Sequence, residues 1–188
     1  MLLRWETTEG LPPSAQFLIR FSDESIKSPS LVLHLERVLK KAGVDGAKFI
    51  FEVTDEFATG QVRKARGFVQ SLKRLGCKTA LTQFGGQANS FCTLKHLDVD
   101  FLKLEQGVTE DLDNPSARSK IHRIQEFANR ANKATIATRV HGARSLALLW
   151  EIGVDYVQGN YTQSPPIELR SMKEYPRDFT KPESRFVY

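Results

Sequence analysis

Short apolar runs alternate along this chain with longer amphipathic segments. The short runs are rich in Val, Ile and Phe and predict strands at Phe17–Phe21, Lys48–Val53, Lys78–Leu81, Phe101–Leu104, Ala134–Ala137 and Asp155–Val157. Between them, apolar residues recur every three or four positions and predict four helices, with the stripes Leu31, Leu35, Val38 and Leu39; Val62, Ala65, Val69 and Leu72; Ile121, Ile124, Ala128 and Ala131; and Leu146, Leu149 and Trp150. Gly43 and Gly76 fit left-handed helix ends directly before strands.

This alternation of strands and helices predicts parallel strands joined by right-handed crossovers. The six strands, with a further one within residues 1–5, suit a complete or partial (β/α) barrel of the TIM type. A doubly wound open sheet is the alternative, but no glycine-rich phosphate loop follows the first strands. In such barrels, functional residues gather at the carboxyl ends of the strands.

Composition fits one globular domain, with 188 residues, 40% apolar and 26% charged. No apolar run approaches the roughly 20 residues of a membrane span, and no signal segment starts the chain, so we expect a cytoplasmic protein.

Cys77 and Cys92 are expected to be buried or half-buried free thiols rather than zinc ligands. Four prolines in residues 165–188 predict that residues 167–188 form a C-terminal tail.

The net charge of +5 permits an anionic partner. A polynucleotide groove would combine clustered Lys and Arg with exposed aromatic side chains. The sequence shows the basic residues spread along the chain without such a stripe. We therefore expect no polynucleotide partner.

Five segments at the predicted strand ends resemble, in order and spacing, the motifs of the EAL domain, a family of cyclic di-GMP phosphodiesterases. The family patterns ELTE, DDFGTG, VDxLKID, VxAEGVE and QGxxxxxP align with Glu52–Asp55, Thr82–Gln87, Val99–Glu105, Thr135–His141 and Gln158–Pro165. The resemblance covers about residues 1–166, which it implies to be one EAL barrel domain.

The resemblance implies hydrolysis of cyclic di-GMP with two Mg²⁺ or Mn²⁺ ions held by carboxylates and an Asn, but the motifs depart from the family at those positions. The Asn is replaced by Arg20, and the two Asp of DDFGTG are replaced by Thr82 and Gln83. The first Glu of VxAEGVE is replaced by Thr138. The signature Glu would fall just before Met1, whereas Glu52, Lys103 and Gln158 are retained. Because one carboxylate does not hold two divalent ions against their hydration, we expect no bound metal, no cofactor and no hydrolysis.

Cationic side chains can neutralise a phosphodiester without metal, and Arg4, Arg20 and Lys103 are candidates to do so. The alternative is that Arg20 pairs with Glu52 and replaces the metal structurally. The ligand-binding residues implied by the resemblance are Leu2, Arg4, Arg20, Glu52, Gln83, Lys103, Thr138, Gln158, Gly159 and Pro165. Phe84 and Tyr161 are candidate platforms for a guanine base.

Degenerate family members of the FimX receptor type, known from type IV pilus regulation, keep the fold without the metals and act through partners such as PilZ-type proteins. The resemblance therefore implies a catalytically inactive cyclic di-GMP receptor in motility or biofilm regulation, in the homodimer typical of the family. The alternative is a ligand-free protein-interaction domain. The strand before the signature and a helical segment after Ser14 have no counterpart here, so either the N-terminal side of the barrel is incomplete or these elements lie outside the given sequence.

Overall fold

The computed structural model describes residues 16–159, in which six parallel strands form one sheet with the spatial order β1-β2-β3-β4-β5-β6. The strands are β1 (Phe17–Arg20), β2 (Phe49–Thr54), β3 (Lys78–Phe84), β4 (Phe101–Leu104), β5 (Ala134–Ala137) and β6 (Tyr156–Val157). Each strand pairs in parallel with the next one along the chain. The predicted TIM-type βα architecture is confirmed, and the described residues form part of such a barrel.

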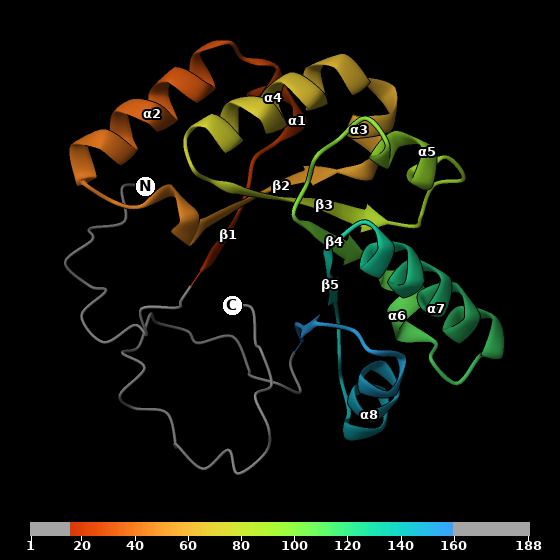
Figure 1. The fold of residues 1–188 in the computed structure, drawn as a ribbon. Coiled ribbons are helices and arrows are strands. Elements are labelled where there is room, and N and C mark those ends of the chain that lie inside the picture. Colours follow the sequence, from red (N-terminus) through yellow and green to blue (C-terminus); the bar gives the residue numbers. More distant parts are fainter. Residues whose placement is uncertain (1–15, 160–188) are drawn as a thin grey trace, which may run out of the picture.

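Four longer helices lie along one side of this sheet (Figure 1) and match the four predicted stripes. They are α2 (Ser30–Ala42), α4 (Val62–Arg74), α7 (Pro115–Arg130) and α8 (Ala143–Ile152). Short helical turns that the sequence pattern did not predict are α1 (Asp23–Lys27), α3 (Asp55–Gly60), α5 (Ser90–Leu94), α6 (Gln106–Glu110) and the 3-10 helix η2 (Gly46–Lys48). No helix of residues 16–159 is long and apolar enough to cross a membrane.

Some predictions are corrected or extended by the structure. Strand β3 runs three residues beyond the predicted Leu81, to Phe84. Both cysteines are free thiols, but only Cys77 is buried, whereas Cys92 is exposed. The strand predicted within residues 1–5 and the tail from residue 167 lie outside the described residues.

The two faces of the sheet carry separate apolar clusters. On the helix side, strand residues such as Phe51, Leu81 and Leu102 pack with Leu72 of α4 and Ile124 of α7. The other face, called the inner face below, holds a smaller cluster made only of strand residues, namely Ile50, Ala80, Phe101 and Ile136, with Leu18, Ala134 and Tyr156 packed against it. Since successive side chains of a strand point to opposite faces, this split assigns every strand position to a face.

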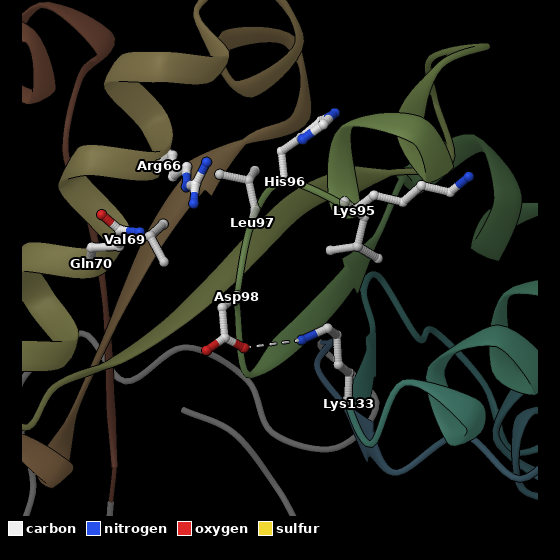
Figure 2. A pocket seen from close by; sticks show the side chains of 9 residues that line it. Arg66, Val69, Gln70, Lys95, His96, Leu97, Asp98 and Lys133 are labelled. Atoms are coloured by element: carbon white, nitrogen blue, oxygen red, sulfur yellow. Dashed lines mark ion pairs between the residues drawn. The ribbon is translucent and has the colours of Figure 1, made fainter.

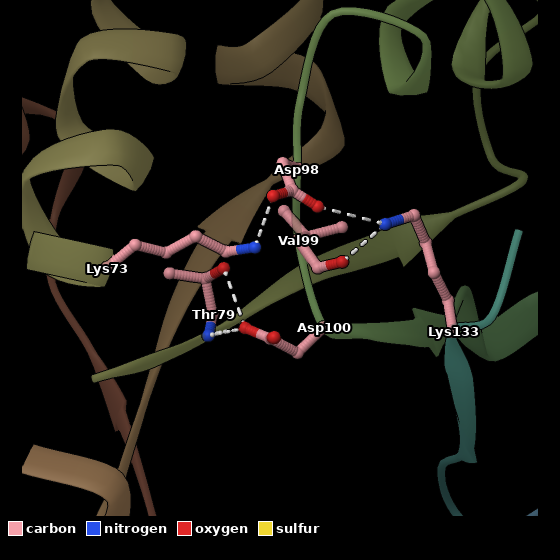
Figure 3. Close-up of polar contacts among 6 residues, drawn as sticks. All are labelled: Lys73, Thr79, Asp98, Val99, Asp100 and Lys133. Atoms are coloured by element: carbon pink, nitrogen blue, oxygen red, sulfur yellow. Dashed lines mark hydrogen bonds and ion pairs between the residues drawn. The ribbon is translucent and has the colours of Figure 1, made fainter. Parts of the chain in front are cut away.

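Two aspartates fix the amino ends of neighbouring strands. Asp100 accepts hydrogen bonds from the backbone N–H of Thr79, at 2.8 Å, and from its hydroxyl, at 3.3 Å (Figure 3). Asp155 repeats the arrangement, 2.8 Å from the backbone N of Thr135 and 3.0 Å from its hydroxyl. Each aspartate ties the start of its own strand to the strand before it, which sets the register of the sheet.

We expect Thr135→Val to lower the free energy of unfolding by about 1–3 kcal/mol, because valine keeps the shape but leaves buried polar groups without a partner. The Thr135 hydroxyl is fully buried and also lies 2.7 Å from Oε1 of Gln125. Urea unfolding measures the change, and Thr79→Val is a parallel test of the other clamp. An unchanged midpoint in both variants would show that the clamps do not stabilise the sheet.

Candidate functional site

A row of polar side chains follows the carboxyl ends of the strands on the inner face. Strand alternation places polar residues there from every strand or directly after it, of which we consider Arg20, Glu52, Thr82, Lys103, Thr138 and Gln158; Thr54 also lies on this face and caps α3. We call the six considered residues the inner-face polar set. They lie beyond the apolar cluster of the same face, whose amino end also carries Lys78, with its Nζ 5.7 Å from the centroid of the Phe101 ring.

Glu52 and Lys103 form the central contact of this set. Nζ of Lys103 lies 2.6 Å from Oε1 of Glu52, and the two side chains are 17% and 6% exposed. The hypothesis that Arg20 is the ion-pair partner of Glu52 is wrong, because the partner is Lys103, which lies two strands away on β4. Arg20 is the neighbour of Glu52 in the β1–β2 register, and its side chain is exposed.

Thr82 carries a polar atom that its surroundings do not satisfy. Its Oγ1 is buried without a hydrogen-bond partner. Thr82 pairs in register with Thr54 on β2, the strand that carries Glu52. A buried hydroxyl without a partner costs free energy, so this position is suited to a hydrogen bond from a bound ligand or water.

Gln83 lies off the inner-face polar set because the strand is irregular there. Its φ of +58° is left-handed, and the β3–β4 register shifts between Leu81 and Phe84. The bulge reverses the alternation, so Phe84 points to the helix side, where it is fully buried and packs edge-on against Phe91 at 5.2 Å. Phe84 is therefore not accessible as a base platform, whereas Gln83 is exposed at the rim.

Thr138, Gln158 and Gly159 lie together where β5 and β6 end. The backbone of Gln158 continues the pairing, since its N–H donates to the Ala137 carbonyl at 2.8 Å and its carbonyl accepts from Val140 at 3.2 Å. A Cβ on Gly159 would lie 2.3 Å from the backbone N of Val140, so only glycine fits this approach. Thr138 donates to the Leu104 carbonyl at 3.4 Å.

The loop between β3 and α5 is anchored by Asp55, which is fully buried at the start of α3. The hydroxyl of Ser90 and the backbone N–H of Gln87 donate to its carboxylate. Burial raises the pKa of Asp55, and these two hydrogen bonds oppose the rise. Its Oδ1 has no partner, so the anchor contains a buried, incompletely satisfied carboxylate at the rim of the site.

We expect Asp55→Asn to stabilise the protein at pH 7 and to lose this advantage at acid pH. An acid with a raised pKa in the folded state contributes stability below its ordinary pKa of 3.8, and this contribution is lost as the pH rises through the folded-state value. Asparagine can still accept from Ser90 and carries no charge to desolvate. Urea unfolding at pH 4 and pH 7 tests this, and an equal effect at both values would contradict it.

The structure thus brings Arg20, Glu52, Lys103, Thr138 and Gln158 to one face, with Gly159 and Gln83 at the margins. Leu2, Arg4 and Pro165, and the candidate platform Tyr161, lie outside the described residues. Two features were missed as ligand or anchor residues. The sequence pattern marks Thr82 only as a replaced aspartate, and nothing in the local pattern around Asp55 indicates its distant partner Ser90.

The donors of the inner-face polar set do not meet the needs of a pair of divalent cations. Glu52 is the single carboxylate among the six, and its Oε1 is engaged by the Lys103 ammonium. Within residues 16–159, no group of three or more His, Cys, Asp or Glu side chains is arranged to hold a metal ion. Because hard cations need several oxygen ligands, mostly charged, this set does not fit a pair of divalent ions.

Comparison with known proteins identifies related sequences over nearly this whole region. The family model described as the EAL domain matches residues 1–165. Cyclic di-GMP phosphodiesterase PdeF of Escherichia coli strain K12 is 26% identical over 163 residues, 86% of this chain and 22% of PdeF. Cyclic di-GMP phosphodiesterase PdeA of Borreliella burgdorferi is 27% identical over 150 residues, 79% of this chain and 22% of that protein. The chain thus spans about a fifth of the length of these curated relatives.

Solved structures with the same fold include two EAL domains of FimX. The domain from Pseudomonas aeruginosa, bound to c-di-GMP, superposes with a TM-score of 0.79 at 29% identity, over 83% of this chain and 64% of that one. The domain from Xanthomonas citri, in complex with c-di-GMP, gives a TM-score of 0.76 at 30% identity, over 80% of this chain and 60% of that one.

Proposed function

The chain belongs to the EAL domain family, and we propose that within this family it is a catalytically inactive receptor that binds cyclic di-GMP without metal. In this proposal, residues 1–166 are the receptor domain, residues 167–188 are a tail, and the ligand lies across the inner-face polar set. The chain would act in the cytoplasm and signal through a protein partner.

The observation that carries this proposal is that the inner face has cationic and neutral side chains at positions where the family motifs have oxygen ligands for metal ions. Lys103 pairs with Glu52, Arg20 is the neighbour of Glu52 in the strand register, and the other members of the set, Thr82, Thr138 and Gln158, are neutral. A phosphodiester is an anion, and an arginine guanidinium can donate two parallel hydrogen bonds to its oxygens. The buried hydroxyl of Thr82 offers a further polar contact in the same region.

The same exchange supports the absence of hydrolysis. A two-metal mechanism requires cations that activate water and stabilise the leaving oxygen. Glu52 is the single carboxylate of the set and is paired with Lys103, so the set offers no ligand group for two metal ions within residues 16–159. The similarity to FimX domains in complex with c-di-GMP supports ligand binding, although the curated relatives named above are phosphodiesterases.

Signalling in this proposal passes to a protein partner, of which a PilZ-type protein in type IV pilus, motility or biofilm regulation is one kind, with a homodimer as a further assembly. The alternative, a ligand-free interaction domain, is favoured by one feature. The Glu52–Lys103 pair already satisfies its own charges, so the inner face does not require a ligand for electrostatic balance.

Isothermal titration of the full chain with cyclic di-GMP in excess EDTA tests the proposal. We expect binding with a Kd below tens of micromolar, about −6 kcal/mol or stronger. Arg20→Ala should weaken binding at least about tenfold, as should Arg4→Ala, because a phosphate loses its forked hydrogen bond. The matched control is Arg37→Ala, which removes an exposed arginine from α2.

Three outcomes distinguish an inactive receptor, an enzyme and a ligand-free interaction domain. Binding in EDTA together with intact cyclic di-GMP after incubation with Mn²⁺ supports the inactive receptor. Appearance of the linear dinucleotide with Mn²⁺ would show an enzyme. Absence of binding in the wild type would leave the ligand-free interaction domain.

A further inference from the structure

The outer surface of α4 carries only positive charge. The helix contains five cations and no Asp or Glu, whereas its apolar residues Ala65, Phe68, Val69 and Leu72 are buried. Arg63 and Arg66 are three residues apart on one side of the helix, and Lys73 and Arg74 lie two turns further along the same side. Because the apolar side of α4 packs on the sheet, these cations are left on the side that faces solvent and the neighbouring loops.

Two cations from distant parts of the chain border the same surface. Lys95 follows α5 and is exposed, and Lys133 precedes β5. Lys133 is only 12% exposed and is held in place, since its Nζ donates to the Val99 carbonyl at 2.6 Å. Arg66, Lys95 and Lys133 line one cavity of about 400 Å³ between α4 and the segment that leads into β4. Figure 2 shows that the Lys95 side chain extends away from Arg66.

This cavity has an apolar floor and a charged rim. Val69, Leu94 and Leu97 contribute apolar lining, and His96 and Gln70 add polar groups. Asp98 is the one carboxylate of the lining. It is engaged by Lys73 at 2.5 Å and by Lys133 at 3.6 Å (Figure 3), so it does not offset Arg66 and Lys95.

The charge of this surface is strongly positive. Six cations against one carboxylate give the patch a formal charge of +5, the same as the +5 of all 188 residues, with the members Arg63, Arg66, Lys73, Arg74, Lys95, Lys133 and Asp98. We call these seven residues the basic patch. No ion pair of Arg66 or Lys95 is formed within the described part of the chain.

We propose that the basic patch docks an acidic segment of a protein partner, with a carboxylate-bearing side chain entering the cavity beside Arg66. Clustered fixed cations steer an acidic surface and set its orientation. The apolar floor suits the aliphatic stem of such a side chain. The patch lies on the helix side of the sheet, away from the inner-face polar set, so this docking does not depend on nucleotide binding.

Other polyanionic partners fit the patch less well. Binding of single-stranded nucleic acid relies on exposed aromatic platforms, and none of the patch and cavity residues is Phe, Tyr or Trp. Membrane binding combines the electrostatic attraction of basic groups with apolar side chains that insert between lipids. The large exposed apolar residues within residues 16–159, Leu33, Val38 and Trp150, belong to α2 and α8 instead.

The test measures fluorescence anisotropy of three probes with the full chain. They are a fluorescein-labelled peptide of alternating Glu and Leu, a labelled single-stranded oligonucleotide of the same net charge, and vesicles of phosphatidylserine and phosphatidylcholine. The variant Arg66→Ala/Lys95→Ala removes two patch cations, and Arg37→Ala/Lys41→Ala removes two exposed cations from α2 as the matched control. Circular dichroism verifies that both variants fold.

We expect the peptide to bind more tightly than the oligonucleotide or the vesicles. The patch variant should lose roughly tenfold in affinity, while the control stays within about twofold of the wild type. Equal losses in both variants would overturn the proposal, because binding would then follow overall charge. Preference for the oligonucleotide or the vesicles would likewise overturn it in favour of that class of partner.

Discussion

Replacing Lys103 with methionine is expected to lower the free energy of unfolding by about 3–5 kcal/mol. Methionine keeps most of the apolar stem but removes the ammonium group that lies 2.6 Å from Oε1 of Glu52. Glu52 is 6% exposed, so water does not replace the lost cation, and a buried charge without a partner is strongly destabilising. Urea unfolding at pH 7 measures the loss.

The double variant Glu52→Gln/Lys103→Met identifies the cause. If the cost comes from the unpaired carboxylate, neutralising Glu52 should recover most of the stability, because neither side chain then carries a buried charge. Lys40→Met is the matched control, since Lys40 makes a 2.7 Å ion pair with Glu36 on the exposed surface of α2 and its loss should change little. A double variant as unstable as Lys103→Met would assign the loss to packing instead.

The sequence predicted the strands of this fold well because each one is a short apolar run between helical stripes. Helices α2, α4, α7 and α8 are long enough to show a period of 3.6 residues, whereas α1 and α5 have five residues each, too few for a periodicity. The end of β3 was missed because Thr82 and Gln83 interrupt the apolar run just where the strand becomes irregular.

The sequence predicted which residues lie in the candidate site but not which of their side chains contact one another. Motif alignment and strand ends placed Arg20, Glu52 and Lys103 near one another, yet the choice of Lys103 over Arg20 as the partner of Glu52 depends on how strands are staggered across the sheet. The error at Phe84 has a similar origin, because a left-handed residue at position 83 reverses which face the next side chain occupies.

The basic patch likewise could not be predicted from the order of residues in the sequence. Arg66, Lys95 and Lys133 are separated by 29 and 38 positions, so the cations seemed evenly spread along the chain. The crossover helices of a parallel sheet bring such positions together on its outer side. Charge clustering of this kind follows from the topology and has no counterpart in local composition.

Glu52→Gln is expected to tighten cyclic di-GMP binding by about tenfold, the opposite of its effect in a metal-dependent enzyme. In the proposed receptor, the Glu52 carboxylate pairs with the Lys103 ammonium that would otherwise contact the phosphodiester, and it would repel the phosphate. Glutamine keeps the shape and releases the cation. Titration in excess EDTA measures the change, with Glu126→Gln on the exposed face of α7 as the control of equal charge.

The sign of this effect distinguishes the two possible roles of Glu52. A carboxylate that holds a catalytic cation stabilises the bound nucleotide through that cation, so its removal weakens binding and abolishes hydrolysis. A carboxylate that competes with the nucleotide for Lys103 has the reverse effect, and the gain should be lost in Glu52→Gln/Lys103→Met because the released cation is then absent. Weaker binding by Glu52→Gln in EDTA would show that the carboxylate itself contacts the ligand, for example by accepting a hydrogen bond from a guanine N–H. The Glu52–Lys103 pair would then be part of the ligand-binding surface and would not compete with the ligand.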